Sequence, residues 1–272
     1  MKNYLYLFIF FLYNFSFSQI IKEEISLPKL INETSGLEYD KNRLITINDS
    51  GNEPVLYYLN NQGEIISTRK IKNVNNNDWE DLAIDDEYIY IADMGNNFDT
   101  RGNLSIIKVP INEELNNVEF INFSYPEQKS FSFRRLSMFD AEALISIDKS
   151  LLIFTKNRAK KTTDIYKLPK TPGTYSAKKI GSLNTESIIT GADFDKENNL
   201  LVLTSTIDFN EYYILIIQDF NIKNNQNNNI KMYEIPVGKT QIEAIKIIDS
   251  STFWLTSEAE IMGYPKLYKI KI

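Results

Sequence analysis

Short apolar runs separated by polar clusters recur along the chain, and helical periodicity is nearly absent. Many of these runs alternate between apolar and polar positions, and they end at clusters of Asn, Asp, Gly and Pro. This pattern is typical of short strands joined by tight turns, so it predicts an all-β protein. The third group of runs, for example, reads DAEALISI, SLLIFTK, TDIYKLP and YSAKKIGS, which we interpret as four strands.

A motif of one acidic residue beside small and apolar residues opens each group of strands. It reads ETSGLEYD, WEDLAIDD, DAEALISID, TGADFDKEN and IEAIKIIDS, in that order along the chain. Successive acidic residues are 47 to 62 positions apart, and they are Glu33, Glu80, Glu142, Asp193 and Glu243. Because the four-stranded blades of β-propellers repeat at about this period, the motif predicts a propeller.

The last group of strands is one strand short before the chain ends. The segment IIKEEISLPKL, residues 20–30, precedes the first motif and has the pattern of a fourth strand. A strand from the opposite terminus that completes the last blade removes the open sheet edges. The sequence therefore predicts five blades of four antiparallel strands, closed by the N-terminal strand. Six blades is the alternative, because the long interval around YPEQKSFSFRRLSM has room for extra strands.

The first residues differ from the rest of the chain. MKNYLYLFIFFLYNFSFSQ carries one lysine, then an apolar run, and it has serine at positions 16 and 18. This order is typical of a secretory signal peptide, with cleavage before Gln19. We therefore expect a signal peptide at residues 1–18 and one propeller domain at residues 19–272, secreted to the periplasm or the cell exterior without membrane insertion. An uncleaved anchor is the alternative, although the run is short for a bilayer span.

Composition narrows the chemistry that is available to the protein. The formal net charge is −6, which gives no electrostatic attraction to nucleic acid or to an anionic membrane. The chain contains no cysteine and no histidine, which excludes disulfides, Ser-His-Asp triads and Cys- or His-ligated metals. Chemistry is left to carboxylates, Lys, Arg, Tyr or an oxygen-ligated ion, and Ca²⁺ is the natural candidate ion.

The acidic motif residues belong to the strands that line the central channel of a propeller. We expect them to converge at one mouth, together with residues at the ends of the second strands, which return to the same face. The candidate metal ligands are Glu33, Glu80, Asp81, Asp93, Glu142, Asp193 and Glu243. The candidate ligand-binding residues are Asp49, Arg101, Lys156 and Glu258. Several carboxylates at one mouth repel each other unless a cation or basic side chains lie between them.

A structural role is the alternative for the repeated acids, which would then bond the backbone of the next blade. We interpret Asp78, Asp85 and Asp86 as residues of solvated turns. Trp79 is expected between blades, and Trp254 in the core.

The order of the motifs resembles a group of uncharacterised secreted bacterial β-propellers. The matching stretches are SGL…NDSG, WEDLA…IYIADMGNN…R, DAEAL…TK, TGADF and EAI…SE, and they cover nearly all of the mature chain. That group is distantly similar to phytase-like and SdiA-regulated-like propellers. One departure is that no arginine ends the strand after TGADF, so the anion-binding role of that arginine is not implied here. The pattern of the group falls on Glu80, Asp81, Asp93, Arg101, Glu142, Lys156, Asp193, Glu243 and Glu258.

The resemblance implies several functions. A non-catalytic domain would bind a small molecule, a surface ligand or a divalent cation through the acidic face, and this is the function that we favour. A calcium-dependent, phytase-like phosphoesterase is the alternative, with Lys156 and Arg101 as phosphate contacts. An arabinanase-type glycosidase, with Glu142 and Glu243 as its carboxylates, is a further alternative. The fold alone does not decide among them.

Overall fold

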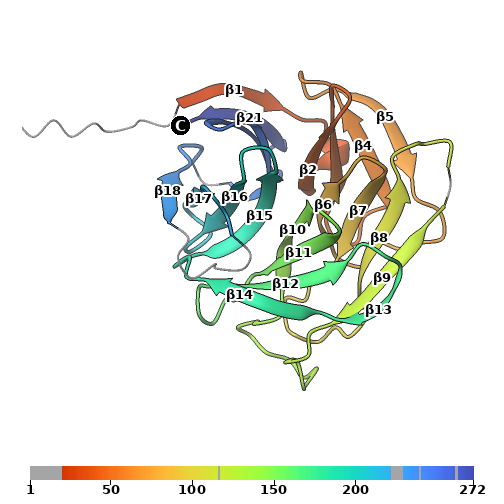
Figure 1. Cartoon of the computed structure of the whole chain (residues 1–272). Helices are drawn as coiled ribbons and strands as arrows, with labels where there is room; N and C mark the ends of the chain where they lie inside the picture. The colour runs from red at the N-terminus through yellow and green to blue at the C-terminus, as the bar shows by residue number, and fades with distance from the viewer. Residues whose placement is uncertain (1–19, 116, 222–228, 239, 261–262) are drawn as a thin grey trace, which may run out of the picture.

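The computed structural model describes residues 20–115, 117–221, 229–238, 240–260 and 263–272. The predicted signal peptide therefore lies outside the described residues. No helix in the described ranges combines the length and hydropathy that a membrane span requires. The chain forms an all-β ring of five antiparallel sheets around a central axis (Figure 1).

Four of the five blades follow one another along the chain. The first blade contains β2 (Thr34–Asp40), β3 (Arg43–Asn48), β4 (Val55–Leu59) and β5 (Ile65–Lys70). The second contains β6 (Trp79–Ile84), β7 (Tyr88–Asp93), β8 (Leu104–Pro110) and β9 (Glu119–Ser124). The third contains β10 (Ala141–Ile147), β11 (Ser150–Thr155), β12 (Thr163–Pro169) and β14 (Lys178–Leu183). The fourth contains β15 (Ile188–Asp195), β16 (Leu200–Thr206), β17 (Tyr212–Ile217) and β18 (Ile230–Glu234).

The fifth blade joins the two ends of the ring. It contains β19 (Ile242–Asp249), β20 (Thr252–Ser257), β21 (Lys266–Lys271) and the N-terminal β1 (Ile20–Ser26). In Figure 1 the red β1 lies along the blue β21, and a short 3-10 helix, η1 (Lys29–Ile31), follows it toward the first blade. The predicted five blades and their closure by the N-terminal strand are confirmed. The long connection at residues 125–140 contains no strand, so the six-bladed alternative is wrong.

The fourth strand of the third blade differs from the predicted one. Part of the segment YSAKKIGS belongs to β13 (Gly173–Ser176), which pairs in parallel with β9 of the second blade. Only β14 completes the third blade. The backbone N–H of Ala177 donates to the carbonyl oxygen of Ser124 at 2.9 Å, and this bond continues the pairing beyond β13. The extra strand covers a sheet edge that would otherwise be open.

A β-bulge interrupts the first strand of every blade near its start. The residue that each bulge leaves unpaired is Gly36, Glu80, Glu142, Thr190 and Glu243, from the first blade to the fifth. A bulge turns one side chain out of the regular alternation of a strand, and it often does so beside a functional site. The bulges therefore set three glutamates apart from the rest of the channel-lining strands. The sequence motif predicts that Glu33 and Asp193 occupy the positions equivalent to these glutamates in the first and fourth blades. The strand register shows that Gly36 and Thr190 occupy those positions instead.

Apolar clusters fill the spaces between adjacent blades. Trp79 is fully buried in a cluster that includes Ile45 and Ile47 of the first blade, which confirms its predicted place between blades. Trp254 is buried in the cluster where the fifth blade meets the first, which confirms its core position. These contacts fix the blades relative to each other and so fix the geometry of the channel mouth.

Candidate functional site

A cavity of about 280 Å³ lies at the channel mouth where the first strands begin. Its lining side chains come from all five blades, and most of them are charged or polar. They include six carboxylates and two basic groups, and they are Glu33, Ser35, Asp49, Ser50, Glu80, Asn97, Glu142, Lys156, Arg158, Phe209, Gln241, Glu243 and Glu258. We call this space the mouth cavity.

Two sets of chain positions supply the carboxylates. Glu80, Glu142 and Glu243 are bulge residues of first strands. The remaining predicted residues that line the cavity either precede β2 or follow a second strand, and they are Glu33, Asp49, Lys156 and Glu258. In each blade the first strand leaves the mouth and the second returns to it. The structure therefore brings together seven of the eleven residues that the sequence singled out.

Asp93 and Arg101 pair with each other beside the mouth cavity instead of lining it. The Arg101 Nη2 donates to Asp93 Oδ1 at 2.7 Å, and its Nη1 donates to the carbonyl oxygen of Gly95 at 2.7 Å. The other Asp93 oxygen accepts from Asn77 Nδ2 at 2.6 Å. These bonds fasten the loop after β7 to the end of that strand and to the turn before β6.

Asp81 and Asp193 also lie outside the lining of the mouth cavity, where they link neighbouring blades. Asp81 Oδ2 accepts a hydrogen bond from the backbone N–H of Leu144 in the third blade at 2.7 Å. Asp193 Oδ2 accepts from the backbone N–H of Ile247 in the fifth blade at 2.7 Å. The alternative of a structural latch thus describes the contacts of these two aspartates. Some acidic residues of the motif therefore line the mouth cavity, and others bond the backbone of the next blade.

Burial shapes the protonation of the cavity carboxylates. Burial first, and then the negative charges of Glu142 and Asp49, raise the pKa of Glu80 well above its ordinary value. Burial likewise raises the pKa of Glu142 to about 7, although Lys156 lowers it. Burial and the charge of Asp49 raise the pKa of Glu258 to about 7. The cavity therefore favours carboxyl groups that hold protons or that share a nearby positive charge.

Two basic side chains occupy the third-blade side of the mouth cavity. The Lys156 ammonium is buried and donates to Glu142 Oε1. Burial alone would lower the pKa of Lys156, but Glu142 and Glu243 raise it above its ordinary value. Arg158 Nη2 lies 3.2 Å from Asp140 Oδ2 and 3.9 Å from Glu142 Oε1. Arg158 and Asp140 were not predicted as site residues, although Arg158 stands two positions after Lys156 in FTKNR and Asp140 opens the motif DAEAL.

The carboxylates form two groups that share Glu80. Asp49, Asp78 and Glu80 offer oxygens within 4.8 Å of one another, and Glu80, Asp140 and Glu142 do the same. Asp78 is therefore no solvated turn residue, because it is only partly exposed and burial, together with Asp49, raises its pKa to about 6. Glu142 Oε2 is buried, and no hydrogen-bond partner reaches it within the described chain. Carboxylate oxygens at this spacing suit a hard cation such as Ca²⁺.

Gly95 lies against the group of Asp49, Asp78 and Glu80, where only a residue without a side chain leaves room for the carboxylates. A Cβ atom at this position would lie 2.0 Å from Glu80 Oε1 and 2.4 Å from Asp78 Oδ2. No side chain fits there unless the carboxylates move. The glycine of IADMGNN is thus required by the close approach of two carboxylates to the backbone.

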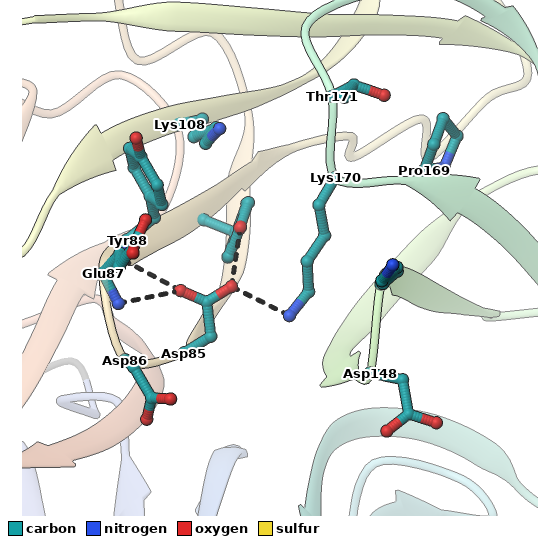
Figure 2. Close-up of a pocket in the computed structure, with 11 residues that line it drawn as sticks. Asp85, Asp86, Glu87, Tyr88, Lys108, Asp148, Pro169, Lys170 and Thr171 are labelled. Carbon is teal, nitrogen blue, oxygen red and sulfur yellow. Dashed lines mark hydrogen bonds and ion pairs between the residues drawn. The ribbon is translucent and has the colours of Figure 1, made fainter.

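A larger cavity of about 620 Å³ lies at the other end of the strands, between the second and third blades (Figure 2). Asp85 is its central side chain and bonds with Tyr90 Oη and Lys170 Nζ, both at 2.8 Å. Asp85 also accepts from the backbone N–H groups of Glu87 and Tyr88, as expected for its turn, and Asp86 is exposed. Since these groups satisfy one another across the two blades, this cavity is a weaker candidate for a site than the mouth cavity.

Comparison with known proteins supports the fold and goes no further. No known family profile matches the chain, and no curated protein matches it in sequence. Among solved structures, the PQQ-bound aldose sugar dehydrogenase from Streptomyces coelicolor is similar, with a TM-score of 0.54 at 9% identity over 93% of this chain and 98% of that one. Hydrazine synthase from Kuenenia stuttgartiensis has a TM-score of 0.46 at 10% identity, over 85% of this chain and 57% of that one. At such identities only the fold is shared, so the repeat group that the motifs resemble gains no support from these comparisons.

Proposed function

We propose that this protein is a secreted propeller that binds a divalent cation, Ca²⁺ by preference, through the mouth cavity. The observation that carries the proposal is the imbalance of charge: six carboxylates and two basic side chains line one small space. Repulsion among buried carboxylates is relieved by protons or by a cation. A cation that takes several oxygen ligands would satisfy them together.

The two carboxylate groups are not equivalent as cation ligands. Glu142 and Asp140 already contact Lys156 and Arg158. In the other group, Glu80 has no ion-pair partner in the described chain, and Asp78 has only Arg101, at 3.7 Å. We therefore assign the cation to Asp49, Asp78 and Glu80, because basic side chains neutralise fewer of the charges in this group.

A titration of residues 19–272 with CaCl₂ and MgCl₂ after treatment with EDTA tests this assignment. A cation that binds only the folded protein raises the free energy of unfolding, by about 2.7 kcal/mol at a concentration of 100 Kd. Glu80→Gln should abolish the rise in melting temperature. Glu197→Gln is the matched control, because Glu197 lies in an exposed turn of the fourth blade. A wild-type melting temperature that is unchanged at millimolar Ca²⁺ would contradict the proposal.

A calcium-dependent phosphoesterase is the second candidate function. Its support is that Lys156 and Arg158 line the same cavity as the carboxylates, so a phosphate group bound there would contact both. Arg158 takes the role that the family resemblance gives to Arg101, since Asp93 holds Arg101. Hydrolysis of p-nitrophenyl phosphate that depends on Ca²⁺ and is lost in Arg158→Gln would establish this activity. Cation binding without hydrolysis would leave the protein a binding domain.

Two other functions have weaker support. A glycosidase site usually presents aromatic platforms, and Phe209 is the one aromatic side chain among the lining residues named above. The similar dehydrogenase is 9% identical to this chain and shares its fold alone, so we do not extend the cofactor in its name, PQQ, to this chain.

A further inference from the structure

The connection between β9 and β10 carries a cluster of exposed apolar side chains. Phe131 is 49% exposed, Phe133 is 68% exposed and Leu136 is 54% exposed, and Phe98 of the loop after β7 is 48% exposed beside them. The rings of Phe98 and Phe133 stack with their centroids 4.8 Å apart. We call these four residues the aromatic patch. Exposed apolar side chains that contact one another, as Phe98 and Phe133 do, are candidates for an interaction surface.

The loop that carries the aromatic patch is firmly anchored. Buried Asp99 accepts hydrogen bonds from the backbone N–H of Phe139 at 3.0 Å and from the Ser137 hydroxyl. Asp99 adopts φ +56°, a conformation that costs free energy in a residue other than glycine and persists only where its surroundings enforce it. Figure 1 shows this connection, in yellow-green, reaching outward beyond the strands of the ring. The fold thus holds the apolar side chains outward instead of burying them.

Basic residues flank the phenylalanines of this loop. Lys129, Arg134 and Arg135 lie within the same ten residues as Phe131, Phe133 and Leu136, in a chain whose net charge is −6. Lys129 and Arg135 are exposed, and Arg134 forms an ion pair with Asp99 at 3.1 Å. Lys129 and Arg135 outnumber Glu127, the one acidic residue between Tyr125 and Asp140, so the loop carries a local positive charge that an anionic surface attracts.

We propose that the aromatic patch and its basic residues dock the protein peripherally on an anionic phospholipid surface. Phe and Leu side chains insert readily into the boundary between the headgroups and the acyl chains of a bilayer. A second copy that docked through the same patch would bring like positive charges together, so it is a poorer partner. Asn97 lines the mouth cavity and Phe98 belongs to the patch, so docking would hold the mouth cavity close to the lipid surface. The proposal does not depend on cation binding.

Vesicle cosedimentation of residues 19–272, a span that contains every described strand, tests the proposal. EDTA is present throughout so that calcium cannot bridge carboxylates to lipid. We expect binding to vesicles of phosphatidylglycerol and phosphatidylcholine, and little binding to phosphatidylcholine alone. Phe131→Ser with Phe133→Ser should weaken binding at least about tenfold. Lys129→Glu with Arg135→Glu, which leaves the Asp99 anchor intact, should weaken it about 25-fold or more, since each basic residue near the surface contributes about fivefold.

Ile66→Ser is the matched control, because Ile66 is an exposed apolar residue of β5, far along the chain from the loop. It should bind like the wild type. Melting curves of every variant show whether the ring stays folded. The proposal is overturned if the wild type ignores anionic vesicles, or if both loop variants bind as the wild type does. It is also overturned if the phenylalanine pair instead controls self-association in sedimentation velocity, since the patch would then be a contact between proteins.

Discussion

Asp81 Oδ2 accepts a hydrogen bond from the backbone N–H of Leu144 at 2.7 Å, and this bond joins the first strands of the second and third blades. Glu80, one residue earlier, lines the mouth cavity instead. The bulge at Glu80 separates these two neighbours, because it shifts the strand register by one residue between Trp79 and Asp81. Adjacent carboxylates of one motif thus have a structural role in one case and a candidate binding role in the other.

Replacing Asp81 with alanine should destabilise the ring. The change leaves the buried amide of Leu144 without its acceptor, and such a group costs about 1–3 kcal/mol. Urea unfolding followed by tryptophan fluorescence measures the loss. In the absence of a cation, Glu80→Gln should keep or raise the free energy of unfolding, because it removes one of several mutually repelling charges. Equal destabilisation by both changes would mean that the two residues share one role.

The stability of the cation-free protein should fall as the pH rises from about 5 to about 8. Glu142 and Glu258 have a pKa near 7 in the folded protein against an ordinary value of 4.5, so between these values the folded state binds more protons than the unfolded state. The stabilisation is complete below about 4.5 and is lost as the pH passes 7. Thermal melts in EDTA at pH 5 and pH 8 should differ by at least about 4 °C.

Calcium bound at Asp49, Asp78 and Glu80 should reduce this pH dependence, because its positive charge favours the ionised forms of the neighbouring Glu142 and Glu258. Glu142→Gln combined with Glu258→Gln should reduce it as well, in EDTA. A melting temperature that rises from pH 5 to pH 8 in EDTA would show that the cavity carboxylates are ionised without a cation.

Gly95→Ala should weaken cation binding at least about tenfold while the ring stays folded. The added Cβ atom would collide with Glu80 Oε1 and Asp78 Oδ2, so these carboxylates must move apart. Calorimetry with Ca²⁺ measures the effect. Gly263→Ala is the control, because a Cβ atom there would meet nothing nearer than 3.6 Å. Wild-type affinity in Gly95→Ala would place the cation away from these two carboxylates.

The sequence predicts the blades better than it predicts the site. Strand alternation and the order of the motifs are enough for five blades and their closure, since both follow from local pattern. The parallel pairing of Gly173–Ser176 with β9 is not predictable in this way, because nothing local in the segment tells one blade edge from another. The motif likewise predicts that Asp193 is equivalent to Glu80. The bulge in β15 puts Thr190 at that position instead, and a sequence does not reveal a bulge.

The sequence predicted that the mouth cavity is acidic, but it did not predict every residue that lies there. Second-strand ends supply Asp49, Lys156 and Glu258 as expected, because strand direction alone brings them to the mouth. Asp78 was assigned to a turn, but the backbone N–H groups of Met94 and Gly95 bond its carbonyl oxygen and hold it beside Glu80. Such contacts between segments that flank different strands depend on the strand register, which the sequence does not give.

Deleting Ile20–Ser26 should open the ring. β1 pairs with β21 along its whole length, and Ile21 and Ile25 pack against the apolar clusters on either side of the fifth blade. Without β1, the edge of β21 is exposed to other chains and the last blade loses a strand, so we expect a lower melting temperature and aggregation in size-exclusion chromatography.

Glu23→Gln with Glu24→Gln, which removes only the ion pairs to Lys269 and Lys266, should cost no more than about 1 kcal/mol. Rescue of the truncated chain by the peptide IIKEEISLPKL would show that the missing strand itself closes the ring. A truncated chain that stays monomeric with an unchanged melting temperature would show that four complete blades and three strands are sufficient.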